Sequence, residues 1–181
     1  AFDGCSSLEF AAAPVFETVT SIGSYAFRGC NSINFGQLRI PNTIKYLGNG
    51  AFDSCNTITA VDIPNLINYD INGVFTNCPN IESVEFSLDN CTSFMHDWRT
   101  ILFDSEMPSD DKYTQCSENI FVPSALKTVS IHDAAVIPDF MFAGMAELKT
   151  INIDGKPKSI GESAFDGCSS LEFAAAPVFE T

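Results

Sequence analysis

Apolar residues recur along this chain in two alternating patterns, which together predict a stack of short rungs. In the first pattern, a pair that usually reads Ala-Phe is followed three residues later by Cys or Met, and then by Leu or Ile. Offsets of 0, 4 and 7 residues bring these apolar side chains to one face of a short helical turn. This first pattern, here called the Ala-Phe phrase, begins at Ala1-Phe2, Ala26-Phe27, Ala51-Phe52, Val74-Phe75, Met141-Phe142 and Ala164-Phe165.

In the second pattern apolar and polar residues alternate, as in a strand with one buried face. The alternating segments are Leu38–Ile40, Val61–Ile63, Val84–Phe86, Val129–Ile131 and Ile151–Ile153. Pro41 and Pro64 each follow a segment of this kind, where a missing N–H does little harm. Further apolar elements lead back to the next phrase at Val19–Ile22, Ile44–Leu47 and Ile67–Ile71.

The chain also repeats over a longer interval, because residues 1–18 and 164–181 both read AFDGCSSLEFAAAPVFET. The spacings of the strand segments predict seven rungs of about 23 residues within this 163-residue interval. Since neighbouring strands lie about 4.8 Å apart, seven rungs would advance roughly 34 Å. Neither end resembles a natural terminus, so we expect the chain to be an uncapped excerpt of a longer protein.

Residues 87–119 fit the two patterns poorly. We expect one irregular rung there, with Trp98–Phe103 as its strand, because its spacing matches that of Leu126–Ile131. The polar run Asp104–Asn119 is rich in Ser, Asp and Glu and predicts a surface excursion. As a departure from the repeat, it is a candidate interaction loop. Its candidate residues are Asp104, Glu106, Asp110, Asp111 and Tyr113.

These phrases resemble the BspA-like, or Treponema-type, leucine-rich repeat. That family reads Leu-x-x-Val-x-Ile-Pro and then Val-x-x-Ile-Gly-x-x-Ala-Phe-x-x-Cys, and its best instance here runs from Leu148 to Leu171. The similarity spans essentially residues 1–181, with departures such as Pro138 for Gly and Met145 for Cys. It implies one α/β solenoid of the leucine-rich repeat class, with a parallel sheet of short strands on one face and short helical turns and loops on the other. It also implies a non-enzymatic role outside the cell or at its surface.

The seven cysteines fall into two groups. One group occupies the repeated position, where we expect buried thiols that stack as a ladder: Cys5, Cys30, Cys55, Cys78 and Cys168. Cys91 and Cys116 lie off this ladder, either as a disulfide that ties the base of the excursion or as two unpaired thiols. Asn90 begins an Asn-Cys-Thr sequon, which would accept a glycan only in a eukaryotic secretory protein.

A net charge of −14 disfavours binding to nucleic acid and to anionic membranes, because no basic patch offsets it. No apolar run reaches the roughly 18–20 residues of a membrane-spanning helix, so we expect no membrane insertion of this segment. The spacing from Cys91 to His96 matches no zinc pattern, and His132 is expected to be a solvent-side residue. The acidic residues of 104–111 lack the calcium-binding loop pattern. We predict no catalytic, cofactor or metal site.

Two functions remain open. The identity of the two copies favours a structural or adhesive protein of tandem blocks, which associates through neighbouring blocks as a filament or surface stalk. The alternative is a surface receptor or adhesin that binds a protein or glycan through the sheet face or residues 104–119.

Overall fold

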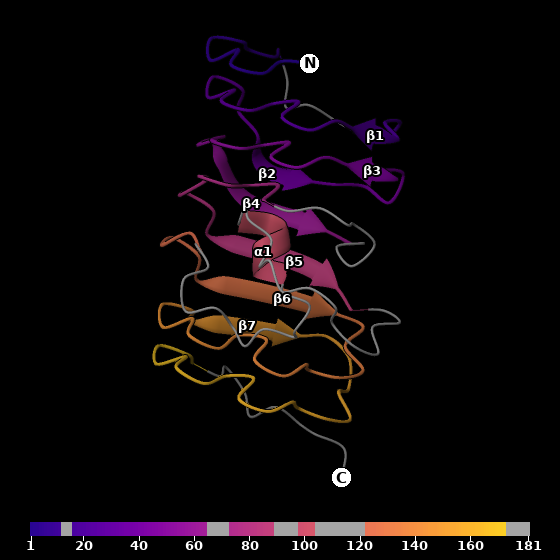
Figure 1. Cartoon of the computed structure of the whole chain (residues 1–181). Coiled ribbons are helices and arrows are strands. Elements are labelled where there is room, and N and C mark those ends of the chain that lie inside the picture. The colour runs from indigo at the N-terminus through magenta and orange to yellow at the C-terminus, as the bar shows by residue number, and fades with distance from the viewer. Residues whose placement is uncertain (12–15, 65–72, 89–97, 104–121, 173–181) are drawn as a thin grey trace, which may run out of the picture.

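The structure, a computed structural model, describes residues 1–11, 16–64, 73–88, 98–103 and 122–172 as a stack of rungs (Figure 1). Five strands form one parallel sheet in the order β2-β4-β5-β6-β7. They are β2 (Gly36–Arg39), β4 (Ile58–Ile63), β5 (Ser83–Ser87), β6 (Thr128–His132) and β7 (Thr150–Ile153). Because neighbouring strands are parallel, the chain returns after each strand to the end of the sheet where that strand began, which produces a solenoid.

The register of the sheet places the apolar residues of successive strands side by side. Val84 of β5 pairs with Val61 of β4 on one side and with Val129 of β6 on the other. All three are buried, whereas Glu85, the next residue on β5, is exposed. This alternation confirms the strand pattern expected from the sequence.

A second, two-stranded parallel sheet lies along another side of the stack. It consists of β1 (Ser21–Ile22) and β3 (Tyr46–Leu47), whose residues Ile22 and Leu47 pair and are both buried. These strands lie within the apolar elements expected at Val19–Ile22 and Ile44–Leu47. The third expected element, Ile67–Ile71, falls outside the described residues.

The Ala-Phe phrases form tight turns rather than helical ones. Their backbone bonds span three residues, as when the N–H of Cys30 donates to the carbonyl of Phe27 at 3.1 Å. Two positions in each turn have left-handed backbone: the residue before the phrase, such as Tyr25 (φ 55°), and the residue before Cys, such as Ser54 (φ 59°). A right-handed helix cannot continue through such residues, yet the apolar face expected from the spacing is still buried.

The strand expected at Trp98–Phe103 is wrong, because these residues form the short helix α1 (Trp98–Phe103). The sheet does not include it, since β5 pairs directly with β6. Leu102 instead takes the phrase position: its carbonyl accepts the N–H of Phe75 at 2.6 Å, as that of Val74 accepts the N–H of Phe52 at 2.9 Å.

The type of the preceding residue explains why a helix forms here. Regular rungs have Tyr25, Gly50, Gly73, Phe140 or Ser163 at that position, each with positive φ. The corresponding residue of α1 is Ile101. A β-branched residue strongly disfavours the left-handed region, so the backbone stays right-handed and continues as a helix.

This assignment also changes the longer period. The described residues contain seven phrase positions, at Ala1, Ala26, Ala51, Val74, Leu102, Met141 and Ala164. The two copies of the repeated segment are therefore six rungs apart rather than seven. With about 4.8 Å per rung, one block advances roughly 29 Å instead of 34 Å.

Stacked aromatic rings form much of the core. The ring of Phe52 stacks on those of Phe27 and Phe75, with distances between ring centres of 5.3 Å and 5.5 Å. In the rung that contains α1, the buried indole of Trp98 packs against Phe86 at 5.4 Å. Its Nε1–H donates to the carbonyl of Met141 at 2.9 Å, which connects α1 to the next turn.

Candidate functional site

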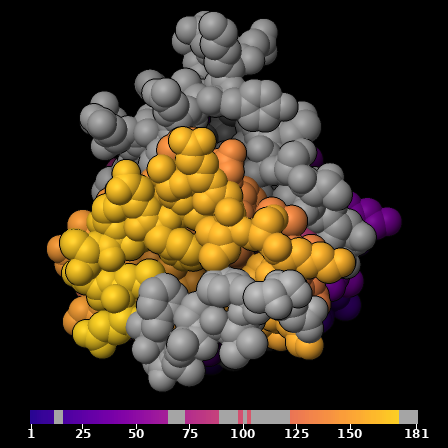
Figure 2. All heavy atoms as spheres, turned by 90° about the horizontal axis from the view of Figure 1, so that it is seen from below, coloured from indigo at the N-terminus to yellow at the C-terminus, as the bar shows by residue number. Residues whose placement is uncertain are grey.

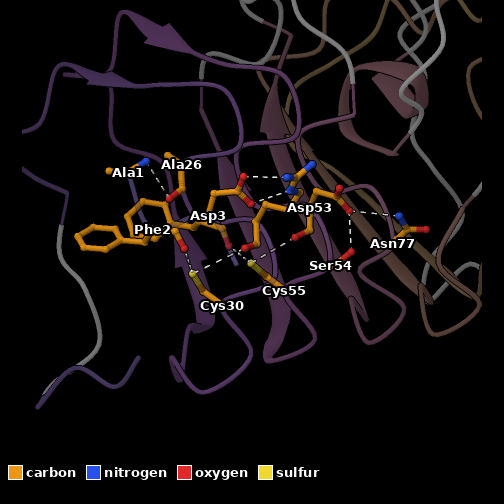
Figure 3. A network of polar contacts seen from close by, with 11 residues as sticks. Ala1, Phe2, Asp3, Ala26, Cys30, Asp53, Ser54, Cys55 and Asn77 are labelled. Atoms are coloured by element: carbon orange, nitrogen blue, oxygen red, sulfur yellow. Dashed lines mark hydrogen bonds and ion pairs between the residues drawn. The ribbon is translucent and has the colours of Figure 1, made fainter. Parts of the chain in front are cut away.

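One candidate surface is the column of turns, here called the turn ladder, in which backbone groups of adjacent rungs pair. Figure 3 shows thiol and side-chain contacts along this ladder, such as those of Cys30 and Cys55. The N–H of Phe2 donates to the carbonyl of Ala26 at 2.7 Å, and the N–H of Phe27 donates to that of Ala51 at 2.8 Å. Two residues further along, the N–H of Gly4 donates to the carbonyl of Arg28 at 2.8 Å. Each turn thus donates to the next rung and accepts from the previous one.

Thiols complete this ladder. Cys55 Sγ donates to the carbonyl of Phe27 at 3.0 Å, and Cys78 Sγ donates to that of Phe52 at 3.1 Å. Both side chains are fully buried, and neither forms a disulfide. Burial raises the pKa of Cys55 and of Cys78 to about 12. The buried thiols expected from the sequence are confirmed for Cys30, Cys55 and Cys78, whereas Cys5, in the first rung, is exposed and Cys168 is half-buried.

We expect the thiol of Cys5 to react with iodoacetamide at pH 8 while Cys55 and Cys78 react at least about a hundredfold more slowly, because the thiolate is the reactive form. Mass spectrometry of each peptide over time measures the three rates separately. In urea the rates should converge. Equal rates in the folded protein would contradict the buried ladder.

The repeated segment takes part in the turn ladder in both of its copies, but through opposite faces. In the first copy, the N–H groups of Phe2 and Gly4 donate to the following rung. In the second copy, the carbonyl of Ala164 accepts the N–H of Phe142 at 2.8 Å, and Cys168 Sγ donates to the carbonyl of Phe142 at 3.1 Å. Together, the two copies make the backbone contacts that an internal rung makes with both neighbours.

Charged and polar side chains follow the outside of the turn ladder. Arg28 forms a two-pronged pair with Asp3, its Nε and one terminal nitrogen each lying 2.7 Å from a carboxylate oxygen. The same guanidinium lies 4.7 Å from the ring centre of Tyr25. The hydrogen bond from Arg28 lowers the pKa of Asp3. Asp3 belongs to the repeated segment, so Asp166 is its second copy.

A second candidate surface lies on the exposed face of the sheet. Arg39 Nε lies 3.4 Å from an oxygen of Asp62, one strand away. His132 lies between two carboxylates: its Nε2 is 2.6 Å from Glu85 Oε1, and its Nδ1 is 3.2 Å from Asp154 Oδ2. A shallow depression of about 250 Å³ lies beside Arg39, Asp62, Glu85 and His132. Its lining is completed by Pro64, Phe86, Ser87 and Asp133.

The charges of this surface influence one another. The carboxylates of Glu85 and, to a lesser extent, Asp154 accept hydrogen bonds from the imidazole and so raise the pKa of His132. Burial raises the pKa of Asp62, and the nearby charge of Glu85 acts in the same direction, while Arg39 opposes both. In the part of the chain that the structure describes, no three His, Cys, Asp or Glu side chains are placed to hold a metal ion.

The sequence-predicted site residues mostly fall in other segments. The sequon residue, the off-ladder cysteines and the candidate interaction loop all lie outside the described residues: Asn90, Cys91, Cys116, Asp104, Glu106, Asp110, Asp111 and Tyr113. His96 lies there as well. His132 is partly exposed, as expected, but its contacts were not anticipated. Alignment of the repeats could have indicated the contact between His132 and Asp154, because each of these residues follows the second apolar residue of a strand.

Comparison with protein families is consistent with this architecture. The family model for the BspA type leucine rich repeat region matches in six copies, over residues 1–97 and 102–178. No curated protein sequence matches the chain. Among solved structures, the crystal structure of a leucine-rich repeat protein from Bacteroides ovatus is similar, with 20% identity and a TM-score of 0.37 over 94% of this chain. The match spans 61% of that protein's chain.

The second matched region begins at residue 102, where the structure places the phrase at the end of α1. No helix in the described residues is both long and apolar enough to cross a membrane. With nearly all of its length matched by six copies of the repeat, the chain belongs to the BspA-type leucine-rich repeat family.

Proposed function

We propose that this chain is a segment of a structural or adhesive repeat protein outside the cell or on its surface, in which the 163-residue block recurs in tandem as a filament or stalk. Proteins with BspA-type repeats are often surface-associated, and leucine-rich repeat families are generally non-catalytic. The observation that carries the proposal is the pairing of the repeated segment. In the first copy, the N–H of Phe2 donates to the following rung, and in the second copy the carbonyl of Ala164 accepts the N–H of Phe142 from the preceding rung. One block can therefore follow another without a break in the turn ladder.

Two ends of the stack would be joined in such an array. Phe2 and Phe10 are 36% and 42% exposed at the N-terminal end. Figure 2 shows the opposite end, formed by the C-terminal rungs, where Ile160 is 41% exposed. In a continuous array, the repeated rung would have a neighbour on both faces and would bury apolar surface on each.

A chain of two blocks, residues 1–163 followed by residues 1–181, tests the proposal. The cysteine of the joining rung should resist alkylation as Cys55 does, while Cys5 of the first block stays reactive. Small-angle scattering should show a maximum dimension longer than that of one block by about 29 Å.

The matched control carries a short Gly/Ser spacer before the second block, which should restore the reactivity of the joining cysteine. If the direct fusion and the spacer variant show the same reactivity and similar dimensions, the blocks do not join into one solenoid. The proposal would then fail.

A ligand-binding module remains the second candidate, favoured by the depression on the sheet face. Its lining places Arg39 and His132 among the carboxylates of Asp62, Glu85 and Asp133. Such a surface suits polar groups of a protein or glycan rather than apolar ones. Binding to immobilised glycans and surface proteins, lost on Arg39→Ala and Glu85→Ala, would favour this candidate.

A further inference from the structure

The sheet contains one seam where neighbouring strands are distant in sequence. β5 ends at Ser87, whereas β6 begins at Thr128, and the described helix α1 between them does not belong to the sheet. At the end of the seam, the N–H of Leu88 donates to the carbonyl of His132 at 2.8 Å, and Ser87 Oγ lies 3.3 Å from Asp133 Oδ2. Ordinary strand pairing therefore continues across the seam.

Side chains reinforce this pairing at one point. The imidazole of His132 contacts Glu85 on β5 through Nε2 and Asp154, next to the end of β7, through Nδ1. It thus connects three adjacent strands. Two earlier rungs have Pro41 and Pro64 after the corresponding apolar residue, and proline has no side-chain group that could make such contacts.

The surrounding charges favour an imidazolium. Glu85 faces His132 from β5, Asp154 from β7 and Asp62 from β4, and Asp133 follows directly in the chain. The one described cation of this depression, Arg39 on β2, pairs with Asp62. Several carboxylates therefore surround one imidazole, and only the protonated ring can donate to Glu85 and Asp154 together.

We propose that His132 is a protonation-dependent latch that holds β5, β6 and β7 together across the seam. When the ring is charged, both nitrogens donate. When it is neutral, one nitrogen has a lone pair, which faces an ionised carboxylate, and that contact is lost. The folded state raises the pKa of His132, so the stabilisation is fully present below the unfolded-state pKa of about 6.5 and is lost as the pH rises through the folded-state value.

Hydrogen exchange and NMR on the complete chain test this latch. After correction for intrinsic rates, the amides of β6 and β7 should lose protection several-fold between pH 5.5 and pH 8.5. The pKa of His132, followed by NMR, should be higher than that of an unfolded peptide and should fall in Glu85→Gln and in Asp154→Asn.

The variant His132→Asn is the main control, because its amide carries no charge that titrates in this range. Its protection of β6 and β7 should not change over the same interval. Asn152→Ala, a change on the same face that leaves the latch intact, should keep the wild-type response. An unshifted His132 pKa, or equal pH responses in wild type and His132→Asn, would overturn the proposal. If His132→Asn does not fold, the pKa of His132 in Glu85→Gln and in Asp154→Asn tests the proposal: an unchanged value in both variants would overturn it.

Discussion

The variant Phe52→Ala is expected to lower the free energy of unfolding by about 3–5 kcal/mol, the range for removing a large aromatic side chain from a packed core. Phe52 is fully buried. Its ring stacks on Phe27 and Phe75 and meets the rings of Phe16 and Phe35 edge-on, so truncation leaves a cavity that these rings line. Urea denaturation followed by circular dichroism measures the change.

Phe10→Ala is the matched control. Phe10 is 42% exposed, and its ring meets that of Phe2 at 6.1 Å. We expect it to cost less than about 1 kcal/mol, as for a partly exposed side chain. A loss below about 1 kcal/mol for Phe52→Ala would contradict a continuous aromatic core, because it would mean that the remaining rings refill the space.

The second large effect is expected for Gly48→Ala, which should destabilise the protein by about 2–3 kcal/mol through overpacking. A Cβ at Gly48 would lie 2.1 Å from the backbone nitrogen of Ser24 and 2.6 Å from the carbonyl carbon of Gly23. Backbone atoms cannot rotate away, so the two rungs must separate. Separation would also weaken the bond from the N–H of Gly48 to the carbonyl of Ile22, now 2.8 Å long.

Gly23→Ala provides the control at the same repeat position. No described atom lies within 4 Å of a Cβ built on Gly23, and its φ is not in the left-handed range. The substitution should be neutral or add about 0.4–1 kcal/mol of stability, because it restricts the unfolded chain. Equal losses in Gly23→Ala and Gly48→Ala, measured by thermal unfolding, would show that the close contact is not the cause.

Repetition made most of the fold predictable. A single alternating segment such as Val61–Ile63 indicates little, but five of them beside recurring Ala-Phe phrases indicate a parallel solenoid. The buried thiols followed in the same way, since Cys30, Cys55 and Cys78 share one repeat position and therefore one environment. In each case the local pattern and the stacked arrangement favour the same structure.

The error at Trp98–Phe103 arose where local pattern and repeat position disagree. The spacing of Trp98, Ile101 and Phe103 matches a strand segment, and this match concealed the Leu102-Phe103 pair at the phrase position. Val74 and Met141 already show that the first phrase residue need not be small. Whether the backbone forms a tight turn or a helix at this position depends on φ at Ile101, and hydrophobic periodicity gives no information on φ.

The contacts of the sheet face were the least predictable part. Glu85, His132 and Asp154 come from three rungs, and 47 residues separate the first two. Only the pairing of β5 with β6, which omits the intervening residues, brings them together. The residues of 104–119 lie outside the described residues, so their role as an interaction loop stays a prediction.

The depression beside His132 has a consequence for adhesion if blocks follow one another as proposed. Each block would present it once, on the same face, at intervals of about 29 Å. A surface that displays many copies of a weak ligand could then engage several depressions at once, and each later contact would form at a high effective concentration. Avidity would therefore grow with the number of blocks, so the same length that makes a stalk would also make a multivalent binder.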